Sequence, residues 1–406
     1  MSKSKHFTGQ PIFNQLLSLI PRPLVNRLAR KHNANRYCKK FKCHDHLVTM
    51  LFSSLHQCSS LRELITGMQV CCNRLKHLGL NHTPRKSTLA DANSRRPVGF
   101  FEDLYHEIYD LHYGRLPDSL RGKTKLDRLF IIDSTTISLF STVLAGAGSF
   151  GLNGKKKGGI KAHVLLRAKD NVPCFIKLTE AKQNDRKFLP FVQLPQDSIV
   201  VLDRGYNNYQ KLKEWTEEKV SWIKRPDARA VLKVIEKRPV SEKDKQAGVL
   251  QDNVIEMGNP RTAKLNPIQK VRQVFFYDQE HKKRYEFITN NFKFSPLNIA
   301  DLYKRRWQIE TLFKRLKQNF NLYDFLGDNE NAIRIQLWCT LIADLLVKIV
   351  KDKVAKKRRW SMANLTGLIR LHLSTYINLR AFLENPEKSL IGYHNPIEDQ
   401  LKLFVT

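Results

Sequence analysis

The sequence predicts a mixed α/β core that is preceded by a basic helical domain, interrupted by a β-rich insertion and followed by a helical tail. Three observations support this prediction. Apolar residues recur every three or four positions through the first 112 residues, which is the spacing of amphipathic helices. Two short apolar runs without alternation lie near the middle of the chain. A series of β-type runs then follows between residues 220 and 289.

The amino-terminal region is predicted to be helical and carries a large excess of positive charge. Its apolar spacing predicts helices at residues 13–20, 23–31, 46–56 and 60–70. Residues 1–100 contain 17 Lys and Arg but only 3 Asp and Glu. The basic residues are densest between positions 27 and 42. A second basic segment at 86–97 adds Ser and Thr, which bond phosphate or cap a helix. We therefore expect this region to bind DNA.

Two apolar runs that end at aspartates predict strands of the core. Residues 129–132 precede Asp133, and residues 199–202 precede Asp203. Four apolar residues without alternation predict a strand that is buried on both faces. An aspartate at the end of such a strand is held rigidly at the edge of a sheet.

The segments around these runs complete the predicted core and tail. The patterns predict strands at 128–133 (continuing through 135–140), 161–168, 172–179 and 198–202, with a short helix at 185–192 and another at 209–219. The 107 positions between Asp203 and Glu310 are too many for one loop, and runs at 220–224, 230–235, 273–277 and 284–289 predict a β-rich insertion. Trp222 and residues 275–277 are candidates for stacking on a base, although core packing is the interpretation we favour. Further helices are expected at 331–351 and 361–384.

Residues 302–320 contain no Pro or Gly and are predicted to form one helix with an apolar and a polar side. The polar side carries Tyr303, Arg306 and Glu310, with Lys317 further along. A solvent-exposed helix also carries such residues, but the two upstream aspartates change the interpretation. Two carboxylates at strand ends and one on a packed helix would form a site for Mg²⁺, which prefers carboxylate oxygen.

These motifs together resemble one known family. Tyr303-x2-Arg306-x3-Glu310-x6-Lys317 resembles the signature of the DDE transposases of bacterial insertion sequences, in the insertion-sequence-four type. The segments that begin at Asp133 (Asp-Ser-Thr-Thr) and Asp203 (Asp-Arg-Gly-Tyr) resemble the first and second aspartate motifs of that family, in the same order. The amino-terminal region also resembles the helical domain of one branch of the group.

The resemblance implies a role for each of these residues. The catalytic residues, which would also bind the metal, are Asp133, Asp203 and Glu310. The residues that would contact DNA phosphate are Tyr303, Arg306 and Lys317. The implied cofactor is Mg²⁺, two ions per active site, with Mn²⁺ as a substitute.

The resemblance also implies the fold and the partners. It implies a ribonuclease-H-like core, and three antiparallel strands followed by helix, strand and helix are the order that this fold requires. The expected domains are a helical DNA-binding domain at 1–113, the catalytic core at 126–221 and 290–325, the β-rich insertion at 222–289 and a helical region at 326–406. The implied partners are the terminal inverted repeats and target DNA, both double-stranded, and a second copy of the chain in a homodimer.

The composition agrees with a nucleic-acid partner. The chain has 70 Lys and Arg against 38 Asp and Glu, a formal net charge of +32, and such an excess repels itself unless an anionic partner is present. A generic basic or membrane-surface protein is disfavoured because the charge is spread through segments that are predicted to fold. The longest apolar stretch, residues 337–350, contains Asp344 and Lys348, so no membrane span is expected.

The seven cysteines have irregular spacing that does not suit a disulfide framework, so we expect a reducing cytoplasm. The family resemblance implies that this is the cytoplasm of a bacterium and that the protein associates with the nucleoid. Cys38, Cys43, His44 and His46 have metal-binding side chains. No second Cys pair with zinc-finger spacing follows them, and buried thiols on a helix are the simpler interpretation.

The resulting hypothesis is a transposase that binds the terminal repeats, cleaves the DNA ends and joins the 3′-hydroxyl to target DNA. Two alternatives remain open. One is a plain metal-dependent nuclease of the same fold, and the other is a catalytically silent DNA-binding protein derived from a transposase. The sequence does not determine whether excision passes through a hairpin.

Overall fold

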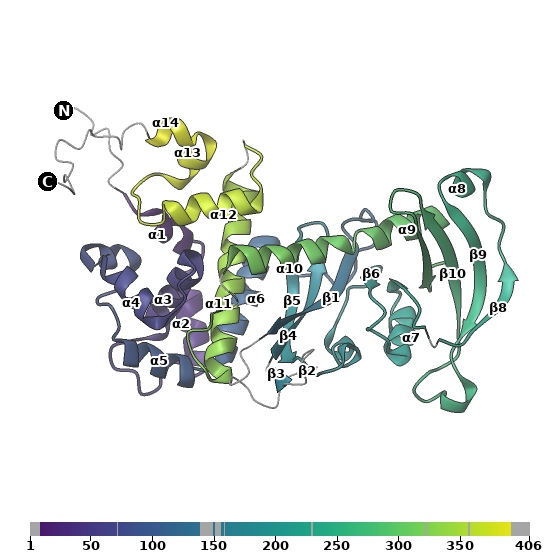
Figure 1. Cartoon of the computed structure of the whole chain (residues 1–406), viewed down its shortest axis with the longest axis horizontal. Coiled ribbons are helices and arrows are strands. Elements are labelled where there is room, and N and C mark those ends of the chain that lie inside the picture. The colour runs from purple at the N-terminus through teal and green to yellow at the C-terminus, as the bar shows by residue number, and fades with distance from the viewer. Residues whose placement is uncertain are drawn as a thin grey trace, which may run out of the picture. The chain divides into compact units, whose positions relative to one another are not determined.

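The structure (Figure 1), a computed structural model, describes residues 9–70, 72–138, 149–150, 156–157, 159–228, 230–320, 322, 324–355 and 358–390. The chain forms two compact units. Unit 1 comprises Met1–Ile108 and Arg315–Thr406, and unit 2 comprises Tyr109–Lys314.

A mixed sheet of nine strands is the framework of unit 2 in the part of the chain that the structure describes. Its spatial order is β5-β4-β1-β6-β7-β11-β10-β9-β8. The strands are β1 Leu129–Ser138, β4 Gly159–Arg167, β5 Val172–Glu180, β6 Ile199–Leu202, β7 Ser221–Lys224, β8 Leu232–Lys237, β9 Val249–Met257, β10 Gln269–Asp278 and β11 Lys283–Thr289. A separate ribbon pairs β2 (Ser149–Phe150) with β3 (Lys156–Lys157). The sheet and its helices confirm the mixed α/β class.

The central strands have the order and directions that position the site. β1 is antiparallel to β4, and β4 is antiparallel to β5. β1 is parallel to β6, and β6 is parallel to β7. The strands lie close to their predicted positions, although residues 139–140 of the first predicted strand are outside the described residues. The four β-type runs predicted for the insertion are β7, β8, β10 and β11, and all four belong to the same sheet.

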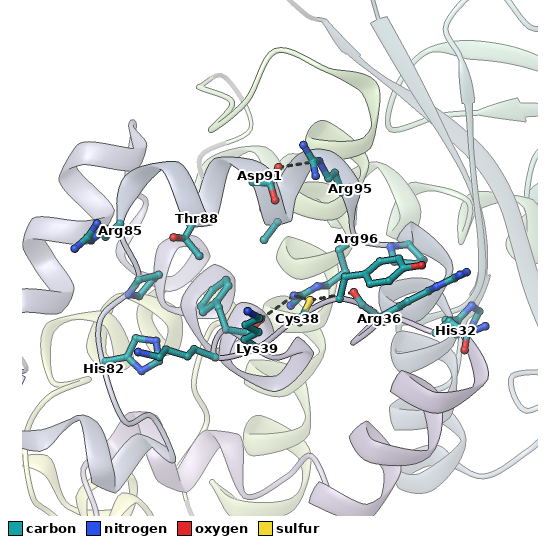
Figure 2. A pocket seen from close by; sticks show the side chains of 18 of the residues that line it. His32, Arg36, Cys38, Lys39, His82, Arg85, Thr88, Asp91, Arg95 and Arg96 are labelled. Carbon is teal, nitrogen blue, oxygen red and sulfur yellow. Dashed lines mark hydrogen bonds and ion pairs between the residues drawn. The ribbon is translucent and has the colours of Figure 1, made fainter.

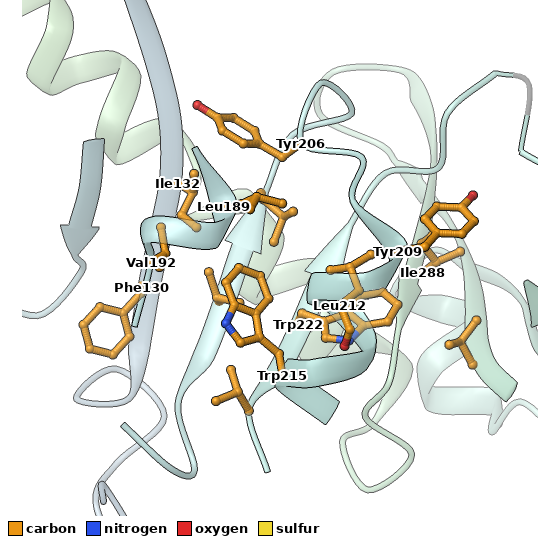
Figure 3. Close-up of a cluster of buried hydrophobic side chains, with 14 of the residues drawn as sticks. Phe130, Ile132, Leu189, Val192, Tyr206, Tyr209, Leu212, Trp215, Trp222 and Ile288 are labelled. Atoms are coloured by element: carbon orange, nitrogen blue, oxygen red, sulfur yellow. The ribbon is translucent and has the colours of Figure 1, made fainter. Parts of the chain in front are cut away.

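One buried cluster stabilises this sheet from the side of α7 (Tyr209–Glu217) (Figure 3). It includes Phe130, Ile132, Trp215 and Trp222, each of which is almost fully removed from solvent. The indole N–H of Trp222 donates a hydrogen bond to the carbonyl oxygen of Leu212 at 3.0 Å. The base-stacking hypothesis is therefore wrong for Trp222, which is a core residue.

The structure corrects one local prediction for unit 2 and adds two elements that were not predicted. Residues 185–192 form two short 3₁₀ turns, Asp185–Lys187 and Leu189–Phe191, because Pro190 interrupts a continuous helix. Strand β9 was missed because its alternation is broken by Asp252 and Asn253, which are buried with polar partners. The charged segment before it contains a short helix, α8 (Glu242–Gln246), whose first turn is capped by Ser241.

Unit 1 is helical in its described residues. Its helices are α1 Ile12–Leu17, α2 Arg22–Lys31, α3 Cys43–His56, α4 Leu61–Val70, α5 Lys86–Arg95, α6 Val98–Tyr113 (in unit 1 up to Ile108), α11 Glu330–Ile349, α12 Met362–Leu371, α13 Leu379–Glu384 and α14 Pro386–Leu390. The first four lie where the apolar spacing predicts them. Helix α11 packs against α3 and α5. Its buried charges are paired, because Arg315 contacts Asp344 at 2.7 Å and Lys348 contacts Asp352 at 2.5 Å.

The described part of the chain contains no helix with both the length and the apolar character that crossing a membrane requires.

Acid should destabilise unit 1 through His46. The His46 ring is fully buried and lies 2.7 Å from Asn93 Oδ1. Burial, assisted by the charge of Arg96, lowers the pKa of His46 to about 3. The stabilisation by the neutral ring is complete above the unfolded-state pKa of about 6.5 and is lost as the pH falls toward 3.

We expect the free energy of unfolding to fall by about 2 kcal/mol at pH 5, because His46 takes up a proton in the unfolded state but not in the folded one. Thermal unfolding of the wild type and His46→Gln at pH 7.5 and pH 5.0 measures it. The wild type should lose more stability than the variant, because glutamine keeps a donor for Asn93 but takes up no proton. Equal losses would contradict the prediction.

Candidate active site

Asp133 and Asp203 lie at matching positions of neighbouring strands. Ile132 of β1 is aligned with Leu202 of β6 in the parallel pair, and each aspartate is the next residue. Neighbouring strands lie about 4.8 Å apart. The two carboxylates therefore lie side by side on neighbouring strands. Asp203 directly follows the end of β6, whereas β1 continues to Ser138, so Asp133 lies within its strand and not at its end as predicted.

The segment that carries Tyr303, Arg306 and Glu310 is two helices rather than the single predicted helix. Helix α9 (Pro296–Lys304) begins at the cap Ser295, and α10 (Trp307–Asn319) begins after a turn at Arg305 and Arg306. The amide of Arg306 donates to the carbonyl oxygen of Tyr303 at 2.9 Å, which is a bond of 3₁₀ type. No Pro or Gly signals this break, and the ion pairs of the Arg306 side chain stabilise it.

Five of the six predicted site residues are brought together around Arg306. Its Nη1 donates to Asp133 Oδ2 at 2.9 Å, and its Nη2 donates to Glu310 Oε1. The hydroxyl of Tyr303 lies 3.4 Å from Asp203 Oδ1. Hydrogen bonds thus connect Asp133 within β1 and Asp203 after the end of β6 to the α9–α10 junction.

Lys317, the sixth predicted residue, lies seven positions beyond Glu310 on α10, in the part of that helix that belongs to unit 1. It is half-buried. Its contact with phosphate stays a prediction.

The environment of the carboxylates favours a bound cation. Burial is the main cause that raises the pKa of Asp133 to about 6, and the charges of Asp203 and Glu310 act in the same direction. The N–H of Ser134 and the guanidinium of Arg306 oppose this shift. Three carboxylates against one guanidinium leave a formal charge of −2, so a divalent cation would balance the group.

Tyr303 keeps its proton in this setting. Its ring is buried against Phe287, at 4.7 Å between ring centroids. Burial raises the pKa of Tyr303 above its usual value, and the nearby charge of Asp203 raises it further. The hydroxyl is therefore a neutral donor, and its nearest acceptor is Asp203.

A second polar group behind Asp133 was not predicted to belong to the site. Asp185 accepts hydrogen bonds from Ser134 at 3.1 Å and from Lys161 at 3.0 Å. A Cβ atom on Gly205 would lie 3.0 Å from Asp185 Oδ2, so the small residue in the second aspartate motif lets these segments approach. These contacts place Asp185 beside Ser134, the residue that follows Asp133.

Lys224 is another residue that sequence reasoning missed. It is aligned with Leu202 across β6 and β7, so it ends the strand next to that of Asp203. Its buried Nζ donates to Asn207 Oδ1 at 2.9 Å and lies 3.4 Å from the carbonyl oxygen of Tyr206. Burial lowers the pKa of Lys224 to about 8, although Asp227 and Asp203 act in the opposite direction. Its contacts fix the loop that follows Asp203. The feature of the sequence that could have indicated Lys224 as a residue near the site is a lysine at the end of an apolar run.

The candidate zinc residues face separate partners. His46 contacts Asn93, and Cys38 Sγ lies 3.3 Å from an Arg96 nitrogen. Cys43 is buried. Among the described residues, the one group of three potential ligands whose atoms all lie within 4.8 Å of one another is Asp278, at the end of β10, with Glu280 and His281 in the turn that follows. Asp133, Asp203 and Glu310 are less tightly grouped, and the Arg306 guanidinium lies between Asp133 and Glu310.

Comparison with known families identifies the chain. Residues 124–346 match the family model described as a transposase DDE domain. The chain belongs to the DDE transposase family. This match spans more than half of the chain and contains Asp133, Asp203, Tyr303, Arg306 and Glu310, together with Lys317. Residues 8–81 match a model described as a domain of unknown function, DUF4372.

Curated relatives agree with this assignment to the DDE transposases. A putative transposase of Sinorhizobium fredii, y4zB, is 32% identical over 268 residues, which are 66% of this chain and 72% of the relative. A putative transposase for insertion sequence element IS4SA of Synechocystis sp. is 24% identical over 327 residues, 79% of this chain and 87% of the relative. The predicted resemblance to insertion-sequence transposases is therefore confirmed.

One solved structure has a weaker likeness. It is that of the piggyBac transposase synaptic complex with hairpin DNA, at 12% identity and a TM-score of 0.45, covering 97% of this chain and 85% of that chain. Agreement at this level is too low to support a conclusion about function.

Arginine at position 306 is expected to be required for its shape as well as its charge. Lysine presents one compact ammonium instead of a planar fork, so it cannot hold Asp133 and Glu310 at the separation that the two Nη atoms of Arg306 set. We expect Arg306→Lys to lower DNA cleavage roughly 10- to 100-fold, as for residues that orient metal ligands. Initial rates over a Mn²⁺ series measure the effect, with the exposed neighbour Arg305→Lys as the control. Equal rates for the two variants would contradict the prediction.

Proposed function

We propose that this chain is an insertion-sequence transposase that binds the terminal repeats of its element, cleaves the DNA ends and joins the 3′-hydroxyl to target DNA. The observation that carries the proposal is the convergence of Asp133, Asp203 and Glu310 on the site held by Arg306 and Tyr303. A DNA-binding protein that has lost transposase activity would not require all five of these side chains.

The proposed catalytic core has a ribonuclease-H-like fold. The order β5-β4-β1-β6-β7, with three antiparallel strands followed by two parallel ones, supports this. In the proposed organisation, residues 126–221 and 290–325 form the core and residues 222–289 are its β-rich insertion. A basic helical domain at 1–113 and a helical region at 326–406 flank the core.

The proposed cofactor is Mg²⁺, with Mn²⁺ as a substitute and two ions per site. Asp133, Asp203 and Glu310 would hold it. The ligand set fits, because all three offer carboxylate oxygen, which hard divalent cations prefer, and their combined charge with Arg306 is −2. When bound, such ions supply an activated nucleophile and stabilise the leaving oxygen on phosphorus.

The residues of the chain would orient the carboxylates and the DNA. Arg306 uses both Nη atoms on Asp133 and Glu310, so it fixes their separation. A bond from Arg306 to phosphate requires the release of one of these contacts, after which the guanidinium offers a fork to phosphate oxygen. Tyr303 orients Asp203 through its hydroxyl, and Lys317 would add a point charge for the DNA backbone.

The proposed partners follow from this chemistry. The charge of +32 suits double-stranded DNA, both the terminal repeats and the target. Joining two ends requires that they be paired, so we propose a homodimer. The proposed location is the bacterial cytoplasm, in association with the nucleoid.

The test is cleavage of a labelled duplex that carries the element's terminal repeat, with Mg²⁺, Mn²⁺ or chelator. The proposal predicts metal-dependent cuts at the repeat boundary and joining of the cut strand to a target plasmid. Cutting without joining and without preference for the repeat would indicate a plain nuclease. Binding without cutting in any metal would indicate a silent DNA-binding protein, and either result would contradict the proposal.

A further inference from the structure

The two basic segments of the amino-terminal region lie about 45 residues apart in the sequence and meet in the structure. They line one cavity of about 900 Å³ in unit 1, between residues 32–41 and residues 82–97 (Figure 2). We term this cavity the basic groove. Figure 2 shows Thr88, Asp91 and Arg95 on α5 along one wall and Arg36 and Lys39 on the loop that forms the other.

The charge of the basic groove is almost entirely positive. Its single acid, Asp91, is neutralised by Arg95 at 2.8 Å. Four further cations of the lining are exposed, and none of them pairs with an acidic side chain in the described part of the chain. They are Arg36, Lys39, Lys40 and Arg85. A concave cluster of unpaired, exposed cations attracts a polyanion.

The walls of the basic groove are held rigidly. Arg96 is buried and donates to the carbonyl oxygens of Lys42 and Phe41, both at 2.9 Å, which attaches the loop to the end of α5. The loop turns at Tyr37, whose φ of +59° is uncommon for a bulky residue. Tyr37 is 88% exposed, and the Arg36 guanidinium lies over its ring at 4.8 Å. A fixed turn thus presents an arginine and an aromatic ring to solvent.

Helix α5 is anchored on one face and open on the other. Its buried residues are Leu89, Ala92 and Asn93. Asn331 at the start of α11 donates to the carbonyl oxygens of Asn93 and Arg96, at 2.8 Å and 2.9 Å. The exposed face carries Lys86, Ser87, Thr88, Asp91 and Arg95. The ten residues of α5 extend about 15 Å, and a major groove about 12 Å wide admits such a helix.

We propose that the basic groove and α5 are the surface by which this chain binds duplex DNA, an inference that rests on the proposed function. The basic groove is too small for a whole duplex, so it takes the backbone of one strand. Arg36, Lys39, Lys40 and Arg85 contact its phosphates. The exposed face of α5 enters the adjacent major groove, where Thr88 and Arg95 meet base edges after Arg95 releases its exposed partner Asp91.

The first test separates phosphate contacts from general charge. Fluorescence anisotropy of the full chain measures binding to a duplex of about 30 base pairs with the terminal sequence, and to a scrambled duplex. We expect Lys39→Gln/Lys40→Gln to weaken binding to both about tenfold or more and to lower the salt slope by about two. The matched control, Arg62→Gln/Lys76→Gln, removes two exposed cations of unit 1 from outside the basic groove. Circular dichroism checks that both variants are folded.

The second test addresses base readout by α5. Arg95→Gln should reduce the preference for the terminal duplex over the scrambled one by about tenfold, as loss of a base contact does. Duplex RNA should compete poorly, because its deep and narrow major groove excludes a helix.

The outcomes separate this inference from the proposed function. If Lys39→Gln/Lys40→Gln binds DNA like its control variant, the inference is wrong while the proposed function stands. Unchanged preference in Arg95→Gln, or equal competition by duplex RNA, overturns the placement of α5 in the major groove. A wild type that binds neither duplex overturns both the inference and the proposed function.

Discussion

Replacement of Glu310 by glutamine will abolish metal-dependent DNA cleavage, with a loss of roughly 10³-fold or more. Glutamine has the same size and keeps an oxygen that accepts from Arg306, so the α9–α10 junction stays intact. The substitution removes one of the three negative charges that the cation requires. Initial cleavage rates of the terminal-repeat duplex in Mg²⁺ and Mn²⁺ measure the loss.

Two controls accompany this prediction. Affinity for the uncut duplex should stay within about twofold, because the carboxylate is not proposed to bind DNA directly. The exposed Glu217 on α7 also belongs to unit 2, and Glu217→Gln should cleave at the wild-type rate. If Glu310→Gln retains cleavage within tenfold of the wild type, the assignment of Glu310 as a metal ligand fails.

Removal of the Asp252 carboxylate will destabilise unit 2 by about 3–5 kcal/mol. Asp252 on β9 accepts two hydrogen bonds from Arg272 on β10, both at 2.8 Å, and both residues are buried. The same guanidinium donates to the carbonyl oxygen of Phe294 at 2.5 Å, in the turn before α9. Asp252→Ala leaves the Arg272 charge buried without its partner. Urea unfolding followed by tryptophan fluorescence measures the change.

The location of this pair also predicts a functional effect. Helix α9 carries Tyr303, so a loosened turn at Phe294 should lower cleavage as well as stability. The double variant Asp252→Leu/Arg272→Met, which removes both charges, should recover most of the stability. The exposed pair Lys245–Glu242 is the control, and Glu242→Ala should change stability by less than about 0.5 kcal/mol. A loss in Asp252→Ala as small as that of the control would contradict the prediction.

The part of the candidate site that could be predicted from the sequence is the part whose position follows from local sequence pattern. Asp133 and Asp203 follow continuous apolar runs, and such runs occur in strands covered on both faces, so their place together on buried core strands was expected. The break between α9 and α10 was not predicted, because no Pro or Gly marks it in the sequence. It depends on the ion pairs of Arg306 with Asp133, 173 positions earlier, and Glu310.

The prediction of the fold was limited by buried polar residues, because their positions also depend on partners that are distant in the sequence. Strand β9 contains Asp252 and Asn253, which alternation rules assign to solvent. They are buried because Arg272 and Gln273 on β10 pair with them. Local pattern carries no information about such partners. The meeting of the two basic segments at the basic groove is likewise a property of tertiary packing.

Direct measurement of cation binding tests the central claim, that Asp133, Asp203 and Glu310 form one divalent-metal site. Mn²⁺ is titrated into the complex of the full chain with terminal-repeat DNA. Electron paramagnetic resonance measures the free Mn²⁺ at each step, and the difference from the added Mn²⁺ gives the number of bound ions. The account predicts that the wild type binds about two ions per active site and that Asp203→Asn, with its duplex affinity unchanged, loses at least one. Equal numbers of bound ions in the wild type and Asp203→Asn would contradict it.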